Sequence, residues 1–469
     1  NDNAEYWNKE VLPFEIYDTS DLQNPVISID GNNQDLSWNE PLEGRIHKAT
    51  YSFDGEVDIE ANYQVQITYS DRAGNKMVDG RTDSTGEELS GEMDTTTGTY
   101  TSPEFILDHK SPKINVTYND AYRVIDGEGA DVGLGIHPKT GQTAYYGSKD
   151  SNGNSEGKIE VTVQITDKYL KTKKVDEQSE DITLEDINVI AEKTETGKSG
   201  SSTTIINVTD LKWEKDGTTY TSRFTIDSSN TSKWGDGDYK VKVLFQESDR
   251  TERAYTDAAG NEMSESDTIQ GGRVDGGKYT STTLILDTEA PKLERSYTAA
   301  PVNSYNGRDY YNSQTNLVIT VGDQNIRYKE LKNALLDMKA FDINGTDLKE
   351  STAAWSEIQA LDENRTSRGS WTATIPLTTE ANYRIPISYV DLAGNAAVLN
   401  TVDQVTVDTT TPADLEFDYS INDPVNYGLF GWLFAQTKMT VRATAKDGTA
   451  GLQYIRFTIV DENKKESVR

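Results

Sequence analysis

The 469-residue sequence contains no cysteine, so it has neither disulfides nor thiol chemistry. Histidine is nearly absent as well: His47, His109 and His137 are the only three, and none has the neighbours of a zinc site. No Walker-type phosphate-binding glycine loop is present. These absences argue against an enzyme. A glycosidase carboxylate pair stays open on composition alone, but the repeat organisation described below disfavours it.

Positive charge is scarce too, with 46 Lys and Arg against 78 Asp and Glu and a formal net charge of −32. Such an excess of acid argues against nucleic-acid binding and against docking on an anionic membrane, and it is compatible with calcium. Long apolar runs are missing: the most apolar stretch, 429–435, is far too short to span a membrane. No secretory signal or anchor is recognisable.

A repeated turn motif organises what is present. Asp-x-Ala-Gly-Asn occurs at 71–75, 257–261 and 391–395. Before the first copy, Tyr63, Val65, Ile67 and Tyr69 alternate with polar residues. This period of two predicts a half-buried strand that runs into a Gly-Asn turn. The leading tyrosine occupies the place of a tyrosine corner in an immunoglobulin-like sandwich.

A second repeated mark predicts the domain ends. A short apolar run, then Asp, then Pro four residues later, occurs with Asp108 and Pro112, Asp287 and Pro291, and Asp408 and Pro412. Proline stiffens each connection. The sequence therefore predicts four domains: 1–108 without its first strand, 113–286 with long loop insertions, 292–407 with a short helix, and a partial domain at 413–469.

Further marks recur within these domains. Strands ending in Asp are expected at Asp18, Asp167, Asp323 and Asp447, most of them after an aromatic pair, and a core tryptophan at Trp38, Trp213 and Trp355. About seven short strands per repeat are typical of a β-sandwich. Near-helical spacing predicts one helix at 328–338. In the last domain, the apolar stretch 427–434 is expected to be partly exposed and mobile.

The sequence resembles the tandem bacterial immunoglobulin-like domains of surface proteins from Gram-positive gut bacteria. The resemblance rests on Tyr310-Tyr311, Ile319–Asp323, Asn382-Tyr383, Tyr389–Asn395 and Val407–Pro412. It implies an all-β, elongated rod at the bacterial cell surface. It also implies a non-enzymatic adhesin or ligand-display protein that binds a host protein, with immunoglobulin as the named candidate. The alternatives are a passive spacer stalk and a carbohydrate-binding array attached to a glycan-degrading enzyme.

The long loops of the second domain are the expected ligand surface. We place it on 121–157 and 247–255, because long loops on a rigid scaffold often carry binding. Tolerated decoration is the other explanation. Within this region, residues 150–156 approach a calcium-loop pattern but lack its glycine and final glutamate positions. An isopeptide crosslink is not indicated, because no lysine recurs at one strand position.

The repeated aspartates also predict calcium at the domain junctions. The Asp that ends one domain should approach the Asp after the second strand of the next domain and the first Asp of its turn motif. The predicted sets are Asp108, Asp167 and Asp257, then Asp287, Asp323 and Asp391, and a pair of Asp408 with Asp447. Ca²⁺ takes six to eight oxygen ligands. In the alternative explanation, each Asp only caps its own turn. No other cofactor is expected.

Overall fold

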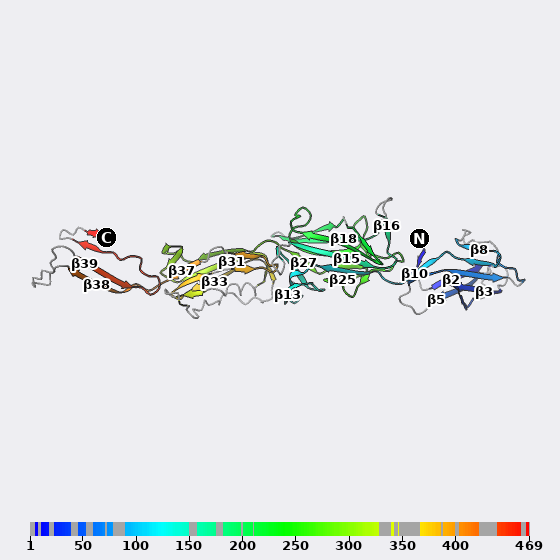
Figure 1. The fold of residues 1–469 in the computed structure, drawn as a ribbon, viewed down its shortest axis with the longest axis horizontal. Helices are drawn as coiled ribbons and strands as arrows, with labels where there is room; N and C mark the ends of the chain where they lie inside the picture. Colours follow the sequence, from blue (N-terminus) through cyan, green and yellow to red (C-terminus); the bar gives the residue numbers. More distant parts are fainter. Residues whose placement is uncertain are drawn as a thin grey trace, which may run out of the picture. The chain divides into compact units, whose positions relative to one another are not determined.

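All described secondary structure in the computed structural model is β-strand (Figure 1). The residues described are 5–7, 11–17, 23–38, 46–52, 60–70, 73–77, 90–149, 157–174, 182–197, 200–209, 211–327, 339–341, 346, 366–385, 388–398, 403–421, 439–460 and 466–468. The helix predicted at 328–338 and the apolar stretch 427–434 lie outside them. In the described part of the chain, no helix could cross a membrane.

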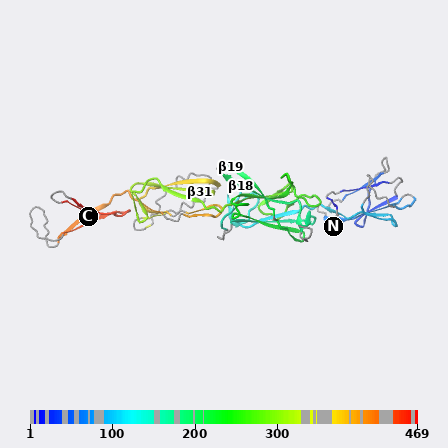
Figure 2. The ribbon, with the colours of Figure 1, turned by 90° about the horizontal axis from the view of Figure 1, so that it is seen from above.

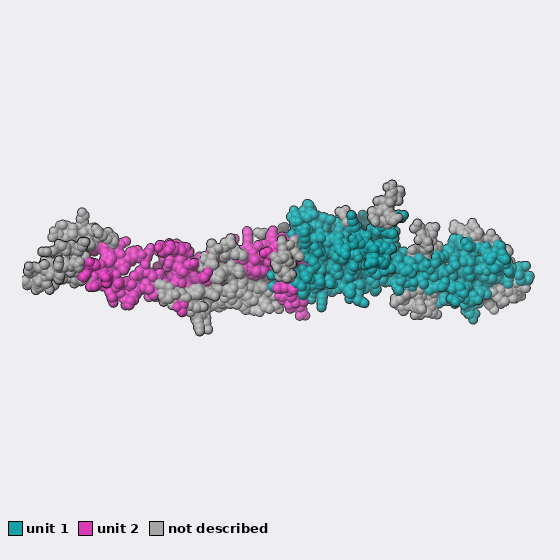
Figure 3. All heavy atoms as spheres, viewed as in Figure 1, with its two compact units in different colours: residues 1–124, 135–144, 158–286 teal, residues 125–134, 145–157, 287–469 magenta. Residues whose placement is uncertain are grey.

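The chain divides into two compact units (Figure 3). The first comprises residues 1–124, 135–144 and 158–286, and the second 125–134, 145–157 and 287–469. The break between 286 and 287 falls at the second predicted junction. The division into four domains stays a prediction.

The first sandwich is built from ten described strands around one apolar cluster. They are β1 (Glu5–Trp7), β2 (Val11–Tyr17), β3 (Gln23–Ile29), β4 (Asn32–Gln34), β5 (Ile46–Ser52), β6 (Glu60–Tyr63), β7 (Val65–Ser70), β8 (Glu92–Asp94), β9 (Thr99–Thr101) and β10 (Phe105–Asp108). The sheets follow the orders β4-β3-β7-β9-β8, β1-β10-β6 and β2-β5. Ile27 and Ile29 pack with Val65, Phe105 and Leu107, and Trp38 lies against this cluster, as predicted for a core tryptophan.

The second sandwich has two large sheets. Its strands are β11 (Lys113–Tyr118), β12 (Ala121–Ile125), β13 (Asp131–Ile136), β14 (Thr143–Tyr146), β15 (Lys158–Thr166), β16 (Thr172–Lys174), β17 (Ile182–Leu184), β18 (Asn188–Gly197), β19 (Gly200–Asn207), β20 (Glu214–Asp216), β21 (Thr219–Asp227), β22 (Gly237–Gln246), β23 (Glu252–Arg253), β24 (Ser264–Glu265), β25 (Gly272–Asp275), β26 (Lys278–Ser281) and β27 (Thr283–Leu286). One sheet runs β20-β21-β15-β11-β24 and the other β13-β12-β14-β27-β22-β18-β19. Every second residue of β15 is buried, and Tyr239, Val241 and Val243 of β22 face inward in the same way. Burying one such side chain contributes roughly 1.5–3 kcal/mol.

The third sandwich repeats this plan. Its strands are β28 (Lys292–Tyr297), β29 (Asn303–Tyr305), β30 (Arg308–Tyr311), β31 (Thr315–Arg327), β32 (Lys339–Phe341), β33 (Thr366–Leu377), β34 (Ala381–Ile385), β35 (Ser388–Val390), β36 (Ala396–Val398) and β37 (Asp403–Val407). The sheets are β28-β31-β33 and β29-β30-β37-β34-β32, with β35-β36 as a separate hairpin. The remaining strands are β38 (Ala413–Ile421), β39 (Met439–Lys446), β40 (Thr458–Val460) and β41 (Glu466–Val468).

The recurring aromatic pairs each lie in a strand beside the last strand of their sandwich. β1 pairs in parallel with β10, β30 pairs in parallel with β37, and β14 lies next to β27. The backbone N–H groups of Asp287 and Asp408 donate to the carbonyls of Tyr146 and Tyr311, at 2.9 Å in both cases. The aromatic strand therefore holds the aspartate that follows the last strand.

The segment 121–157, predicted to be a long loop, instead contains β12, β13 and β14. Its content of Gly, Asp and Ser indicated a loop. However, Val124 and Ile125 are buried in β12, and glycines with positive φ, such as Gly129 (φ 85°), let the chain turn within a compact insertion. The insertion therefore extends a sheet.

The tyrosine corners are confirmed in the second and third sandwiches. The hydroxyl of Tyr239 donates to the carbonyl oxygen of Gly235 (2.5 Å), and that of Tyr383 donates to Thr379 (2.7 Å). In both, the acceptor lies four residues before the tyrosine. These bonds tie the loop before the strand to the core.

Replacement of Tyr239 by phenylalanine tests the corner. Tyr239→Phe keeps the ring against Trp234 but leaves the buried Gly235 carbonyl without its donor. We expect the free energy of unfolding to fall by about 1 kcal/mol, measured by urea denaturation with tryptophan fluorescence. Tyr305→Phe, at a side chain that is 66% exposed, is the control and should change nothing. Equal effects of the two variants would contradict a role for the corner.

Candidate functional site

Three aspartates from distant parts of the chain meet in what we call the first triad: Asp108, Asp167 and Asp257. One carboxylate oxygen from each lies within 4.8 Å of one from each of the others. Asp108 ends β10, Asp167 directly follows β15, and Asp257 opens the second Asp-x-Ala-Gly-Asn turn. All three are buried. The structure thus brings together the three residues that the sequence grouped.

Each carboxylate of the first triad also caps a local turn. Oδ1 of Asp108 accepts the backbone N–H of Lys110 (2.9 Å), and Oδ1 of Asp167 accepts that of Tyr169 (2.7 Å). Oδ1 of Asp257 accepts the N–H of Asn261 (2.9 Å). Turn capping and convergence were alternatives in the sequence analysis, but here they coexist, because each backbone cap occupies only Oδ1 of its aspartate.

The second oxygen of Asp108 has no partner among the residues that the structure describes. Within that part of the chain Oδ2 is buried and accepts no hydrogen bond, and the residue is 0% exposed. Among the described residues, no lysine, arginine or histidine forms an ion pair with a carboxylate of this triad. The nearby Lys110 pairs instead with Glu60 (2.9 Å). A buried carboxylate oxygen without a donor or a cation is costly, so Oδ2 of Asp108 is a candidate ligand atom for a cation.

The hydrogen bonds to these carboxylates do not offset the effect of burial, so their pKa values are raised. Burial raises the pKa of Asp108 to about 6 and that of Asp167 to about 7, and the neighbouring carboxylates add to both shifts. Burial also raises the pKa of Asp257, against the hydrogen bonds from Asn261. A divalent cation would replace the protons and screen the mutual repulsion.

The turn asparagine binds the first triad together. Nδ2 of Asn261 donates to the backbone carbonyl of Asp108 (2.9 Å) and to Oδ2 of Asp257 (2.9 Å). Gly260 takes φ 90° to close this turn. The motif therefore does more than turn the chain: its last residue connects the turn to the end of β10. We interpreted this asparagine as a turn former only, although its recurrence with the aspartates was a usable signal.

The second triad is Asp287, Asp323 and Asp391, again with carboxylate oxygens within 4.8 Å of one another. Nδ2 of Asn395 donates to the carbonyl of Asp287 (2.8 Å) and to Oδ2 of Asp391 (2.9 Å), which repeats the contacts of Asn261. Asp323 lies at a bulge in β31. Burial raises the pKa of Asp323 to about 6 and that of Asp391 to about 8.

One side chain distinguishes the two triads. In the second, Nδ2 of Asn325 donates to Oδ2 of Asp287. At the matching position of the first triad stands Tyr169, whose hydroxyl donates away from the triad to Asn62 (2.9 Å). The second triad therefore satisfies with an amide the kind of oxygen that the first leaves open.

The third predicted pair is also brought together, but without a third carboxylate in the described residues. Oδ2 of Asp408 accepts the N–H of Ala450 (3.0 Å), which Oδ1 of Asp447 also accepts (2.9 Å). Burial raises the pKa of Asp408, and Asp447 adds to the shift. Asp18 and Asp71, the corresponding residues of the first repeat, lie outside the described residues.

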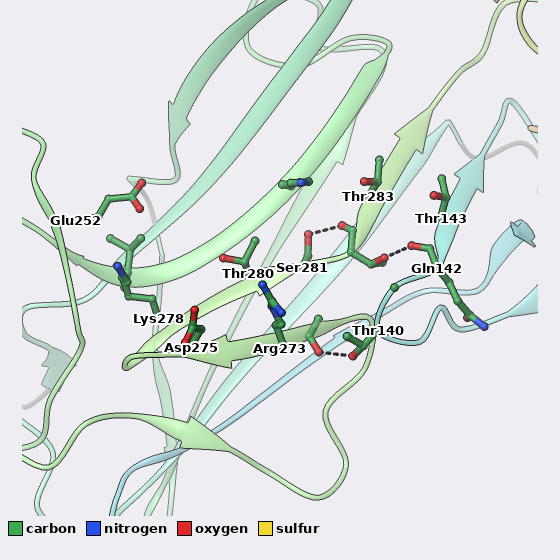
Figure 4. Close-up of a pocket in the computed structure, with 15 residues that line it drawn as sticks. Thr140, Gln142, Thr143, Glu252, Arg273, Asp275, Lys278, Thr280, Ser281 and Thr283 are labelled. Atoms are coloured by element: carbon green, nitrogen blue, oxygen red, sulfur yellow. Dashed lines mark hydrogen bonds between the residues drawn. The ribbon is translucent and has the colours of Figure 1, made fainter. Parts of the chain in front are cut away.

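A polar pocket of about 520 Å³ lies in the second sandwich (Figure 4). Its lining comes from Thr140 to Thr143 at the start of β14, from β22, β25, β26 and β27, and from Glu252 of β23. Thr140 donates to the carbonyl of Gly272 (2.5 Å) and closes one side. Lys240, Arg273 and Lys278 supply positive charge, and none of the described lining residues is aromatic. Both predicted binding segments contribute, whereas the β25–β26 hairpin was not foreseen.

Comparison with known proteins defines no family. No family model and no curated sequence matches the chain. Similar solved structures include two of BcpA, the major pilin subunit of Bacillus cereus. A variant of BcpA shares 10% identity over 82% of this chain and 91% of that chain, with a TM-score of 0.15. The other BcpA structure shares 9% identity over 85% of this chain and 97% of that chain, with a TM-score of 0.15. SGBP-B of a Bacteroides ovatus mixed-linkage glucan utilization locus, solved with a heptasaccharide, shares 11% identity over 89% of this chain and 68% of that chain, with a TM-score of 0.12. At these scores, no function is transferred.

The triads predict an inverted pH dependence of stability without metal. Folded carboxyls with a raised pKa bind protons that the unfolded chain, titrating near about 4, has released. Their stabilising contribution is complete below pH ~4 and is lost as the pH rises through about 6 to 8. We expect the melting temperature in chelator to fall between pH 5 and pH 8.

The control is Asp167→Asn, which cannot titrate and should flatten the fall. Of the charged groups around the first triad, Glu60 and Lys110 pair with each other and Lys168 lies over the ring of Tyr169, and all three remain in both proteins. A melting temperature that rises with pH, or an identical slope in the variant, would contradict the assignment.

Proposed function

We propose that this chain is a non-enzymatic array of immunoglobulin-like sandwiches at a bacterial cell surface, stiffened by Ca²⁺ at its aspartate triads. Its task is ligand display or adhesion, with a host protein as the ligand. The observation that carries the metal proposal is the buried, unpartnered Oδ2 of Asp108 beside two other buried carboxylates.

Calcium fits the first triad by its chemistry. It binds oxygen ligands at about 2.3–2.6 Å and tolerates irregular shells, whereas Mg²⁺ requires near-ideal octahedral geometry. Three ionised carboxylates more than balance the two charges of the ion, and water or backbone oxygens would complete the shell. Because Asp108 ends β10 while Asp167 and Asp257 belong to the second sandwich, a bound ion would restrain the connection at 109–112. The second triad offers the same set with one oxygen already satisfied, so we expect weaker binding there.

Thermal melting tests calcium binding. At a Ca²⁺ concentration 100 times the dissociation constant, the folded state gains about 2.7 kcal/mol. We expect a higher melting temperature in Ca²⁺ than in chelator, a larger gain at pH 8 than at pH 5, and a smaller gain with Mg²⁺. Asp108→Asn should remove most of the gain.

The matched control is Asp126→Asn. Asp126 caps a turn through the N–H groups of Glu128 and Ala130 but belongs to no triad, so its replacement should keep the calcium gain. The metal proposal is abandoned if calcium leaves the wild-type melting temperature unchanged at every pH, or if both variants respond alike.

The pocket supports a protein ligand over the alternatives. A glycan platform would offer flat aromatic rings, and the pocket lining contains none. A passive spacer would need only interchangeable repeats, yet the pocket depends on an insertion specific to the second sandwich. Hydroxyls together with Arg273, Lys278, Asp275 and Glu252 match the mixed polar surface of a protein. Immunoglobulin remains the named candidate, proposed from the family resemblance.

The double variant Arg273→Ala and Lys278→Ala tests the ligand proposal on the full chain. Purified host immunoglobulin, measured by surface plasmon resonance, should bind the wild type and lose about tenfold or more in affinity to the variant. The control Lys215→Ala with Arg223→Ala removes the same charge from β20 and β21 and should bind normally. Equal binding to both variants would show that immunoglobulin binds outside this pocket. No binding to the wild type would exclude immunoglobulin as the ligand.

A further inference from the structure

The strand β19 ends its sheet and is paired on one side only, with β18, among the residues that the structure describes (Figure 2). The pairing is antiparallel and extends from Gly197 opposite Gly200 to Ile190 opposite Asn207. Such an edge presents a row of backbone N–H and C=O groups to any strand that can reach it.

The direction of these groups follows from one hydrogen bond. The N–H of Val208 donates to the carbonyl of Val189 (3.0 Å), so this opposed pair is hydrogen-bonded. Because hydrogen-bonded and non-hydrogen-bonded pairs alternate, the backbone groups of Ser201, Thr203, Ile205 and Asn207 point away from β18. The hydroxyls of Thr194 and Thr203 lie 3.3 Å apart, as expected for a non-hydrogen-bonded pair with close side chains.

The edge lacks the usual protection against pairing. Residues 200–207 read Gly-Ser-Ser-Thr-Thr-Ile-Ile-Asn, with no charge and no proline. Residues 201–205 are all exposed, and the side chain of Ile205 is 46% exposed. By contrast, β20 and β8, which end other sheets, are three residues long and carry charges. Charged or short edge strands are how proteins prevent strand addition.

We propose that β19 is a self-association strand, which pairs antiparallel with β19 of a second copy of this chain. The charge pattern favours this partner. In a protein of net charge −32, identical strands can lie side by side only where they carry no like charges. A partner of opposite charge would have nothing on this edge to recognise.

One register satisfies all the outward groups. With Thr204 opposite Thr204 of the second copy, Ser201 faces Asn207 and Thr203 faces Ile205, so that all four outward residues form hydrogen-bonded pairs. Shifting this register by two residues leaves one of the four outward residues without a hydrogen-bonded partner in the facing strand. Thr204 itself then lies on the two-fold axis in a non-hydrogen-bonded pair, where Cα atoms approach to about 4.5 Å. A contact of this size is below that of a stable dimer, so it suits copies concentrated on one surface.

The absence of cysteine permits a sharp test on the full chain. Thr204→Cys places one thiol per copy on the proposed axis, within the range of a disulfide. Ser202→Cys is the matched control on the same face of the same strand. Its two thiols would be separated by four residues along the strand, roughly 13 Å, which is too far to bridge.

With oxidised glutathione at high protein concentration and raised salt, we expect Thr204→Cys to form disulfide dimers at least about tenfold faster than Ser202→Cys. Adding Ile205→Lys places like charges on the two facing edges, so it should abolish the difference between the two dimerisation rates. Because Ile205 lies on an exposed strand, the change should not unfold the protein. Val302→Lys, at another exposed side chain, should leave it intact. Equal rates for the two cysteine variants, or dimers that survive Ile205→Lys, would overturn the proposal.

Discussion

In each triad, the side-chain amide of the turn asparagine connects the aspartate at the end of the last strand of one sandwich to the turn motif of the next. Asn261 donates at once to the last residue of β10 and to the first residue of its own turn, and Asn395 makes the same two contacts in the third sandwich. Each amide therefore holds two aspartates close together. The third aspartate directly follows β15 in the first triad and lies at the bulge of β31 in the second. The convergence of buried carboxylates is a consequence of this bridge.

Bringing carboxylates together costs free energy through their burial and mutual repulsion, and the two triads offset this cost with different contacts. In the second triad, Asn325 donates to Asp287, and the Oδ1 atom of Asn395 accepts both the N–H (3.0 Å) and the hydroxyl (2.7 Å) of Ser148. Hydrogen-bond donors of the protein thus satisfy part of what a bound cation would satisfy in this triad. In the first triad, Tyr169 stands where the second has Asn325, and Oδ2 of Asp108 accepts no hydrogen bond from the described residues. Under the calcium proposal, this one side chain would give the two triads different affinities for the ion.

The strands and the triads could be predicted from the sequence because both depend on local, repeated signals. Alternation in β15 and β22 reports burial directly, and Asp167 directly follows β15 as predicted, but the strand end predicted at Asp323 was wrong because β31 continues to Arg327. The insertion at 121–157 was misjudged because glycine content indicates turns but not whether the strands between them join a sheet. The pocket and the bare oxygen of Asp108 depend on which side chains meet across sheets, and no local pattern encodes that.

X-ray diffraction from crystals grown in calcium is the most direct test of the metal account. The anomalous signal of the ion should appear between the oxygens of Asp108, Asp167 and Asp257, at about 2.3–2.6 Å from each. The second triad should show a weaker peak or require more calcium. If both triads are free of anomalous density at millimolar calcium and neutral pH, the carboxylates are held by protons and hydrogen bonds alone, and the account is wrong.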